Sequence, residues 1–305
     1  MAQSWGGMSS TISVNSLNDY IRHQAQELQS FSQLANAPTG AAIGRGKGDT
    51  VQYTYSQNLS TTGGALSENE EIPTGTVPTI KNTYTLTEYG NGYTYSNKLA
   101  VFAQIDVEDT FIKALVDDMQ KAMNTAAYTE FNATHWKAVM HSTTPEFVTN
   151  NTPTVTVNQD ISFNGLRYIV KKAMKNLIPF YDGERYVYVT GPESMDALRY
   201  DDRARDVRYD SGRAALNGEC GDMVQCRLVV DNHKIAKINA TEYDSGFLVG
   251  ADAVISEFAS APEILAADQD LGRSCKVAWY FIAAWKKILS QSVHAKEHVI
   301  KVTSA

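Results

Sequence analysis

The most constraining feature of the sequence is a long stretch, residues 37–100, that has almost no apolar face of its own. Gly, Thr, Ser, Asn and Tyr dominate it, and its centre reads SQNLSTTGGALSENEEIPTGTVPTIKN. Long segments without a core are rarely found inside compact domains. Two strand-like pieces with alternating side chains, residues 50–55 and 83–89, flank this centre. We therefore expect a protruding hairpin whose tip is solvated or lies on another molecule.

The strongest helical pattern follows this stretch directly. Residues 106–128 keep apolar side chains at i, i+3, i+4 and i+7, which is typical of an amphipathic helix. Asp106 suits the N-cap position, and Glu108 and Asp109 suit the positive end of the helix dipole. We expect this helix to continue toward residue 139, which would make it the longest element of the chain.

Helical and strand patterns alternate through the rest of the sequence. We expect helices at residues 163–177 and 193–200, and strands at 185–190, 226–230 and 246–258, with two strand-like runs between 276 and 302. Near the start, we expect residues 22–33 to form a short amphipathic helix within a polar arm. This helix should pack on the main body or on a partner. The mixture predicts an α+β fold.

Composition excludes several classes of protein. The chain has 305 residues, enough to bury a sizeable core, and 27 Lys and Arg stand against 34 Asp and Glu. A formal charge of -7 argues against a dedicated nucleic-acid-binding protein, which would carry a basic patch. Cys220, Cys226 and Cys275 form no CxxC pair, so we expect structural thiols in a reducing cytoplasm. Without a signal peptide or a long apolar run, we expect no membrane contact.

One motif indicates possible zinc chemistry. His294, Glu297 and His298 match the HxxEH pattern of inverted zinc peptidases, in which two histidines hold zinc and the glutamate activates water. That pattern works on a helix, where i and i+4 side chains share a face. Here the surrounding residues alternate in a β-branched run, which favours a chance match on a terminal strand. A zinc-dependent hydrolase stays open as an alternative.

Charged residues of the hairpin and of one later segment are candidates for contacts with other molecules. Gly46 and Lys47 resemble a phosphate-binding loop, but Ala41 and Gly48 stand where that motif needs Gly and Ser or Thr, so we expect a hinge. The glutamates near residue 70 could bind a metal or act as paired catalytic acids, but a solvated acidic tip or docking surface fits better. The interleaved charges of residues 201–210 form either a solvated face or an ionic interface. The contact candidates are Lys47, Asp49, Glu68, Glu70, Glu71, Lys81, Asp201, Arg203, Arg205, Asp206 and Arg208.

The order of several short motifs resembles the major capsid proteins of podoviruses related to coliphage N-four. These motifs are Gly46, Gly48-Asp49-Thr50-Val51, Leu66, Glu71, Pro73-Thr74-Gly75 and Tyr89-Gly90, followed by Tyr186-Val187, Pro192, Leu198-Arg199 and the run 279–288. The resemblance covers most of the chain, from about residue 44 to 302, and it is most specific over residues 46–92.

This resemblance implies the Hong Kong 97 phage-type capsid fold. It would divide the chain into an N-terminal arm (1–43), an extended loop (44–99), a spine helix with part of the peripheral domain (100–162), an axial domain (163–261) and a return to the peripheral domain (262–305). It also implies hexamers and pentamers that close an icosahedral virion shell around double-stranded DNA in the host cytoplasm. Scaffolding, portal and decoration proteins are the implied partners, with no cofactor and no sequence-specific DNA contact.

The capsid function therefore stands against two alternatives. One is the zinc-dependent hydrolase, and the other is a different phage structural part, such as a tail or decoration protein. The capsid reading predicts that the extended loop lies over an adjacent subunit, because a loop without a core of its own is ordered by burial and backbone pairing on a partner.

Overall fold

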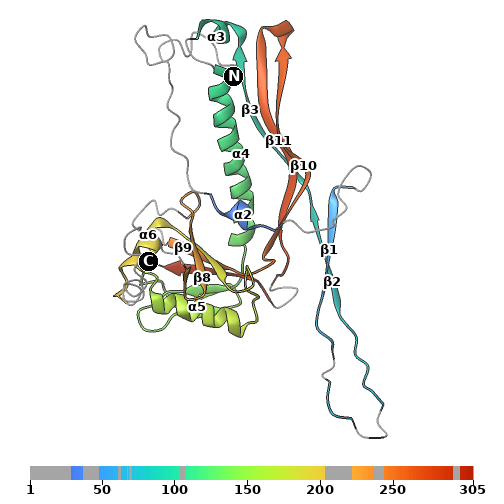
Figure 1. Cartoon of the computed structure of the whole chain (residues 1–305), viewed down its shortest axis with the longest axis vertical. Coiled ribbons are helices and arrows are strands. Elements are labelled where there is room, and N and C mark those ends of the chain that lie inside the picture. Colours follow the sequence, from blue (N-terminus) through green and yellow to red (C-terminus); the bar gives the residue numbers. More distant parts are fainter. Residues whose placement is uncertain are drawn as a thin grey trace.

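The computed structural model describes residues 29–36, 48–60, 63–66, 68, 71–103, 107–202, 222–235, 244–290 and 296–304. These residues form two packed units and a projecting hairpin (Figure 1). We call the first the sheet unit and the second the long unit. Among the described residues, every helix is too short or too polar to cross a membrane.

The sheet unit is built on a seven-stranded sheet with the strand order β5-β4-β12-β9-β6-β8-β7. Its strands are β4 (Lys137–Val139), β5 (Glu146–Val148), β6 (Tyr186–Thr190), β7 (Asp222–Met223), β8 (Cys226–Val230), β9 (Asp244–Val249) and β12 (Val299–Ser304). Every residue of β6 is buried. Because side chains alternate along a strand, Tyr186 and Tyr188 enter one hydrophobic cluster and Val187 and Val189 another, so both faces of the sheet are covered.

The first of these clusters lies between the sheet and α5 (Phe163–Lys175), with α6 (Pro192–Tyr200) contributing Leu198. Ser162 caps α5 by accepting a hydrogen bond from the Gly165 backbone N–H at 3.2 Å. The helix buries the stripe predicted from its spacing, which includes Leu166, Ile169 and Val170. The predictions of α5, β6, α6 and β8 are therefore confirmed to within two residues at each end.

The long unit combines α4 (Val107–Asn132) with a three-stranded antiparallel sheet. The strands follow the order β10 (Val254–Gln269), β11 (Ser274–Lys287) and β3 (Thr87–Ser96), and the short helix α3 (Asn97–Phe102) lies at their far end. The 26 residues of α4 span about 39 Å, and the sheet runs along its length (Figure 1). β3 approaches β11 closely at Gly92, where a Cβ would lie 2.6 Å from the Cβ of Ala278.

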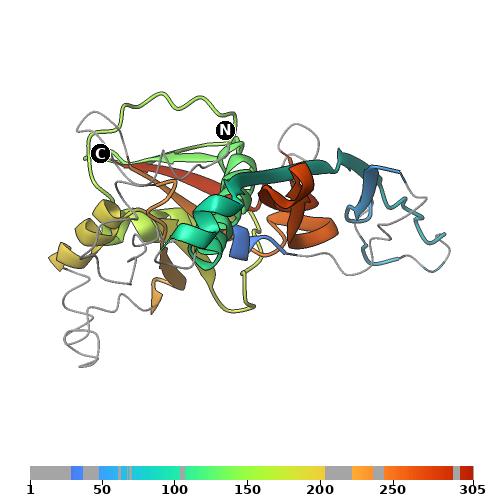
Figure 2. The same cartoon turned by 90° about the horizontal axis from the view of Figure 1, so that it is seen from above.

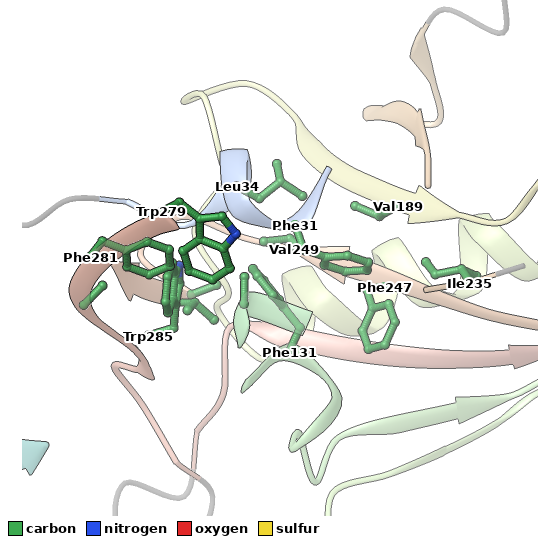
Figure 3. Close-up of a cluster of buried hydrophobic side chains, with 14 of the residues drawn as sticks. Phe31, Leu34, Phe131, Val189, Ile235, Phe247, Val249, Trp279, Phe281 and Trp285 are labelled. Atoms are coloured by element: carbon green, nitrogen blue, oxygen red, sulfur yellow. The ribbon is translucent and has the colours of Figure 1, made fainter. Parts of the chain in front are cut away.

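One hydrophobic cluster joins the two units (Figure 3). Phe31 of α2 (Phe31–Leu34) is fully buried, and its ring lies 5.4 Å from Phe131 of α4 and 5.4 Å from Phe247 of β9. On the side of the long unit, Trp279 and Phe281 stack with centroids 5.4 Å apart. A shared core of this kind makes the two units fold as one body rather than as independent domains.

Polar contacts fix the segment around α2 in the same place. The buried carboxylate of Asp231 accepts hydrogen bonds from the Ser30 N–H at 2.8 Å and from the side-chain amide of Asn124 at 3.3 Å. The Asn124 carbonyl oxygen accepts from the Phe31 N–H at 2.9 Å. The helix expected at 22–33 is helical only from Phe31 in its described part, and this part packs on the main body, one of the two expected placements. Residues 22–28 of that prediction lie outside the described residues.

Three boundary predictions are wrong. The long helix ends at Asn132 instead of continuing to residue 139, because residues 137–139 form β4 and pair with β12. The strand expected at 83–89 is a junction, since β2 (Thr79–Thr85) pairs with β1 (Thr50–Ser56) and β3 pairs with β11. The strand expected at 246–258 is interrupted, because β9 and β10 belong to different sheets.

The last two strands of the chain belong to different sheets. β11 lies in the three-stranded sheet, whereas β12 lies between β4 and β9 in the seven-stranded sheet. The return of residues 262–305 to the peripheral domain stays a prediction. The strand predicted through the HxxEH residues begins only at Val299. The backbone pairing of β12 with both neighbours accounts for this placement, because a strand inside a sheet satisfies its donors and acceptors on both sides.

Candidate intersubunit surfaces

The hairpin formed by β1 and β2 projects from the body beyond β10 and β11 (Figures 1 and 2). Its strands pair antiparallel from Thr50 opposite Thr85 to Ser56 opposite Thr79, and they make a two-stranded sheet of their own. A two-stranded hairpin is marginally stable in water unless its apolar face packs on something else. The base of this hairpin packs on the long unit, whereas the apolar side chains of its distal part stay exposed.

The base of the hairpin packs on the long unit through a small hydrophobic cluster. Tyr84 is buried there with Ile255, Ile288 and Leu289, and the side-chain amide of Asn82 donates a hydrogen bond of 3.0 Å to the Ile288 carbonyl. Burial, with the neighbouring Glu257 carboxylate as a further cause, raises the pKa of the Tyr84 hydroxyl far above its ordinary value. The base is therefore held within the subunit.

The distal part of the hairpin, residues 57–78, runs beyond this cluster. Backbone hydrogen bonds from Gln57 N–H to Pro78 O, at 2.8 Å, and from Ser60 N–H to Thr76 O, at 3.0 Å, keep its two sides together. Four apolar side chains along it are between 48% and 74% exposed: Leu59, Leu66, Ile72 and Val77. Exposed apolar residues gathered on one projection are typical of a surface that binds a partner.

Sequence reasoning missed these four side chains as contact residues. They are visible in the sequence only as isolated apolar residues in a polar run, without the period of a helix or a strand. The structure identifies them because it shows that the distal loop lies clear of the subunit's own core.

Some of the charged contact candidates are described and exposed, and the others lie outside the described residues. Asp49, Glu68, Glu71 and Lys81 are exposed, with Lys81 on β2 opposite Thr54 of β1. Lys47 and Glu70 lie outside the described residues, as do Arg203, Arg205, Asp206 and Arg208 of the later charged segment. Whether these side chains contact another subunit stays a prediction.

Asp201 has a role within the subunit. Its carboxylate accepts a hydrogen bond of 2.9 Å from the Phe163 N–H, in the first turn of α5. A carboxylate at this end of a helix satisfies an orphan donor and complements the helix dipole. Asp201 therefore joins α6 to α5, a contact that its place in a run of mixed charges did not reveal.

The described residues of the HxxEH motif make hydrogen bonds to backbone groups of the fold. The Glu297 carboxylate is buried and accepts hydrogen bonds from the backbone N–H groups of His135, at 2.7 Å, and Trp136, at 3.2 Å. His298 Nδ1 lies 2.6 Å from the Ala251 carbonyl oxygen, and burial lowers the pKa of its imidazole. His294 lies outside the described residues. Within the described ranges, no three His, Cys, Asp or Glu side chains are grouped to hold a metal ion.

The thiols in the described part of the chain are free, and they differ in burial. Cys226 is fully buried on β8, and this burial raises its pKa to about 12. A thiol with such a pKa is almost entirely protonated at neutral pH and is a poor nucleophile. Cys275 is partly buried on β11.

Comparisons with known proteins point to phage particles. No family model and no curated protein sequence matches the chain. Among solved structures, a chain of Mycobacterium phage Che8 superposes with a TM-score of 0.68 at 12% identity, covering 96% of this chain and 97% of that one. The capsid of Ralstonia phage GP4 gives 0.66 at 15% identity, covering 96% and 95%. The acid-stable capsid of Helicobacter pylori bacteriophage KHP30 gives 0.65 at 14% identity, covering 97% of both chains.

Coverage near the full length of both partners means that the likeness includes the hairpin and both units rather than a shared fragment. At identities of 12–15%, what the likeness establishes is the fold. The α+β fold expected from the sequence resemblance is confirmed: this chain has the Hong Kong 97 phage-type capsid fold.

Proposed function

We propose that this chain is the major capsid protein of a tailed bacteriophage, which assembles with copies of itself into the icosahedral shell around double-stranded DNA. The distal hairpin carries the proposal, because it exposes Leu59, Leu66, Ile72 and Val77 on a projection that the subunit's own core does not cover. In an assembly of hexamers and pentamers, the loop would lie on an adjacent copy and bury these side chains. The fold shared with phage capsid chains supports the same role.

A structural role without catalysis fits the rest of the molecule. The HxxEH motif commits its described glutamate and histidine to contacts within the fold. A net charge of -7 would let packaged DNA lie inside the shell without being pinned to it. Scaffolding, portal and decoration proteins remain proposed partners of this assembly in the host cytoplasm and in the virion.

Removing the distal loop tests the proposal directly. Residues 60–75 should be replaced by Asn-Gly, which suits a two-residue hairpin turn. The backbone bond from Gln57 to Pro78, which this variant keeps, holds the two sides together next to the cut. We expect a folded subunit whose melting temperature is close to that of the wild type, since Tyr84 and the base cluster are kept. Negative-stain microscopy should show closed shells for the wild type and dispersed subunits for the deletion.

Two results would count against the proposal. Closed shells formed by the loop-deleted subunit would mean that the loop is dispensable for assembly. Tubes or isolated rings formed by the wild-type protein would favour a tail or decoration component instead.

A further inference from the structure

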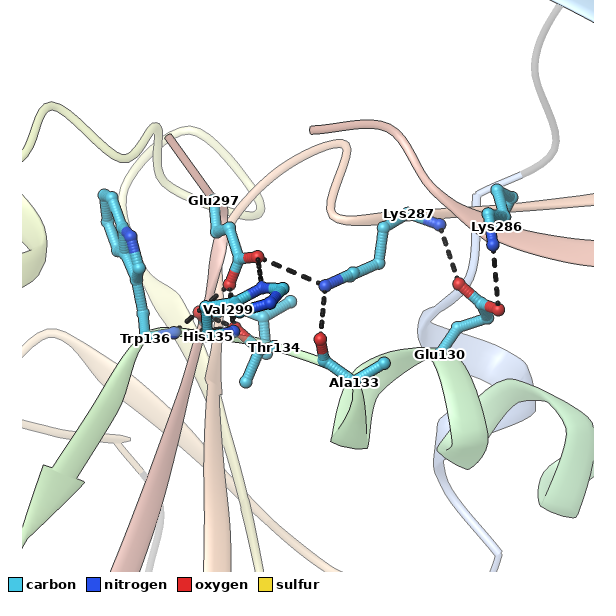
Figure 4. A network of polar contacts seen from close by, with 9 residues as sticks. All are labelled: Glu130, Ala133, Thr134, His135, Trp136, Lys286, Lys287, Glu297 and Val299. Carbon is cyan, nitrogen blue, oxygen red and sulfur yellow. Dashed lines mark hydrogen bonds and ion pairs between the residues drawn. The ribbon is translucent and has the colours of Figure 1, made fainter. Parts of the chain in front are cut away.

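The carboxylate of Glu297, in the HxxEH motif, is buried and surrounded by hydrogen-bond donors. Its side chain is 1% exposed, and one of its oxygens accepts from the Thr134 hydroxyl and from the backbone N–H groups of His135 and Trp136. The other oxygen lies 3.1 Å from His135 Nδ1 and 3.2 Å from Lys287 Nζ (Figure 4). The proposed shell function does not use this cluster.

These contacts come from both units of the fold. Lys287 is the last residue of β11 in the long unit, whereas Glu297 leads into β12 in the middle of the seven-stranded sheet. Thr134, His135 and Trp136 form the connection from the end of α4 to β4. The carboxylate thus lies at the junction where the long unit meets the sheet unit.

The lysine is held from a second side. The Lys287 side chain is 9% exposed. Its Nζ also donates a hydrogen bond of 2.6 Å to the Ala133 carbonyl just past the end of α4, where the helix dipole favours a cation. Its backbone N–H donates to Glu130 at 3.3 Å, and Glu130 pairs with Lys286 at 3.4 Å (Figure 4). Glu297 therefore neutralises a cation that is tied to the helix end.

We propose that Glu297 is an electrostatic clasp that fixes the angle between the long unit and the sheet unit, and that it acts through its negative charge. A buried ion pair contributes little net stability compared with an apolar replacement. Removing one partner is nevertheless destabilising, because the other charge is left buried without compensation. The clasp therefore opposes relative movement of the units. This inference concerns the free subunit, so it stands or falls independently of the proposed shell function.

The test uses the isosteric pair of variants E297Q and K287M, together with the double variant. Glu297→Gln keeps an oxygen for the backbone donors but leaves Lys287 uncompensated, so we expect the melting temperature to fall by about 10 °C. The double variant should melt above E297Q, because it strands no charge. Glu130→Gln is the matched control, since its pair with Lys286 lies at the same junction but is 19% and 48% exposed, and a change of about 2 °C or less is expected.

A second readout reports the angle itself. Spin labels at K98C on α3 and E193C on α6, both exposed positions, measure the separation of the two units by double electron–electron resonance, with Cys220 and Cys275 replaced by Ser. We expect one narrow distance distribution for the wild type and for E130Q, and a broader or shifted one for E297Q and K287M.

Unchanged distance distributions in E297Q and K287M would overturn the proposal, even if both variants melt early, because the cluster would then stabilise the fold without setting the angle. If E297Q does not fold, K287M provides the same comparison, since it removes the cation and keeps the carboxylate in place.

Discussion

Single buried polar side chains determine how distant segments of this chain meet. Asp231 and Asn124 hold the backbone of Ser30 and Phe31, although these pairs are separated by 93 to 201 positions in the sequence. Neither Asp231 nor Asn124 stands in a motif, and a polar residue in a loop or on a helix is ordinarily solvated. Contacts of this kind were beyond prediction from the sequence, because they depend on which elements pack together.

The partly buried imidazole of His298 predicts a loss of stability in mild acid. Burial lowers its folded pKa below the ordinary value of 6.5, so the unfolded chain binds the proton more tightly than the folded one. The stability that neutral His298 provides is present above pH 6.5 and is lost as the pH falls toward the folded pKa. His298→Asn keeps a donor for the Ala251 carbonyl and removes the titration.

Urea unfolding between pH 8 and pH 5 measures this effect. The free energy of unfolding of H298N should depend less steeply on pH below 6.5, by at most about 1.4 kcal/mol per pH unit for one proton. Between pH 7.5 and 8 the two proteins should show the same slope. A wild-type slope that persists in H298N below pH 6.5 would assign the acid sensitivity to other groups.

At the scale of elements, we expect changes in the distal hairpin to weaken assembly while leaving the stability of the subunit nearly unchanged. Replacing Leu59, Ile72 and Val77 by Ser changes side chains that are at least half exposed, so the melting temperature should move by about 2 °C or less. Assembly should weaken at least tenfold, because burying these side chains on a neighbour would contribute several kcal/mol. Light scattering during assembly measures the change.

The control for this variant is Leu177→Ser, an exposed leucine that follows the C-cap residue Asn176 of α5 in the sheet unit. It removes one exposed leucine, the same change as Leu59→Ser, from a surface outside the hairpin. Equal loss of assembly in both proteins would mean that general surface hydrophobicity, rather than the loop, drives association.

Elements were predictable where local periodicity and packing agree. The apolar stripe of α5 and the run of valines and tyrosines in β6 indicate both elements, and the structure buries these side chains. Prediction failed where pairing with a distant strand decided the outcome, as at residues 137–139, which leave the helical pattern to join β12. The hairpin was predictable from its missing core, but its exposed apolar residues carry no period that could mark them as a surface.

At the scale of the whole molecule, the order of strands in space departs furthest from their order in the chain. In the seven-stranded sheet, β12 lies between β4 and β9, although more than a hundred residues separate β4 from β9 in sequence. Both of its neighbours pair with it, β4 parallel and β9 antiparallel. Without β12, the sheet would separate into a pair of strands and a group of four.

Because of this placement, the seven-stranded sheet can form only after β12 has been synthesised. Until residues 299–304 have left the ribosome, the nascent chain has two open strand edges, on β4 and on β9. Open edges favour aggregation or degradation over correct folding. A chain stopped after Lys296 should therefore yield little soluble protein, whereas a chain stopped after Ser304 should behave as the wild type, which pulse-labelling with proteolysis would measure. If the chain assembles as proposed, copies that lack β12 would then be lost to degradation before they could join other subunits.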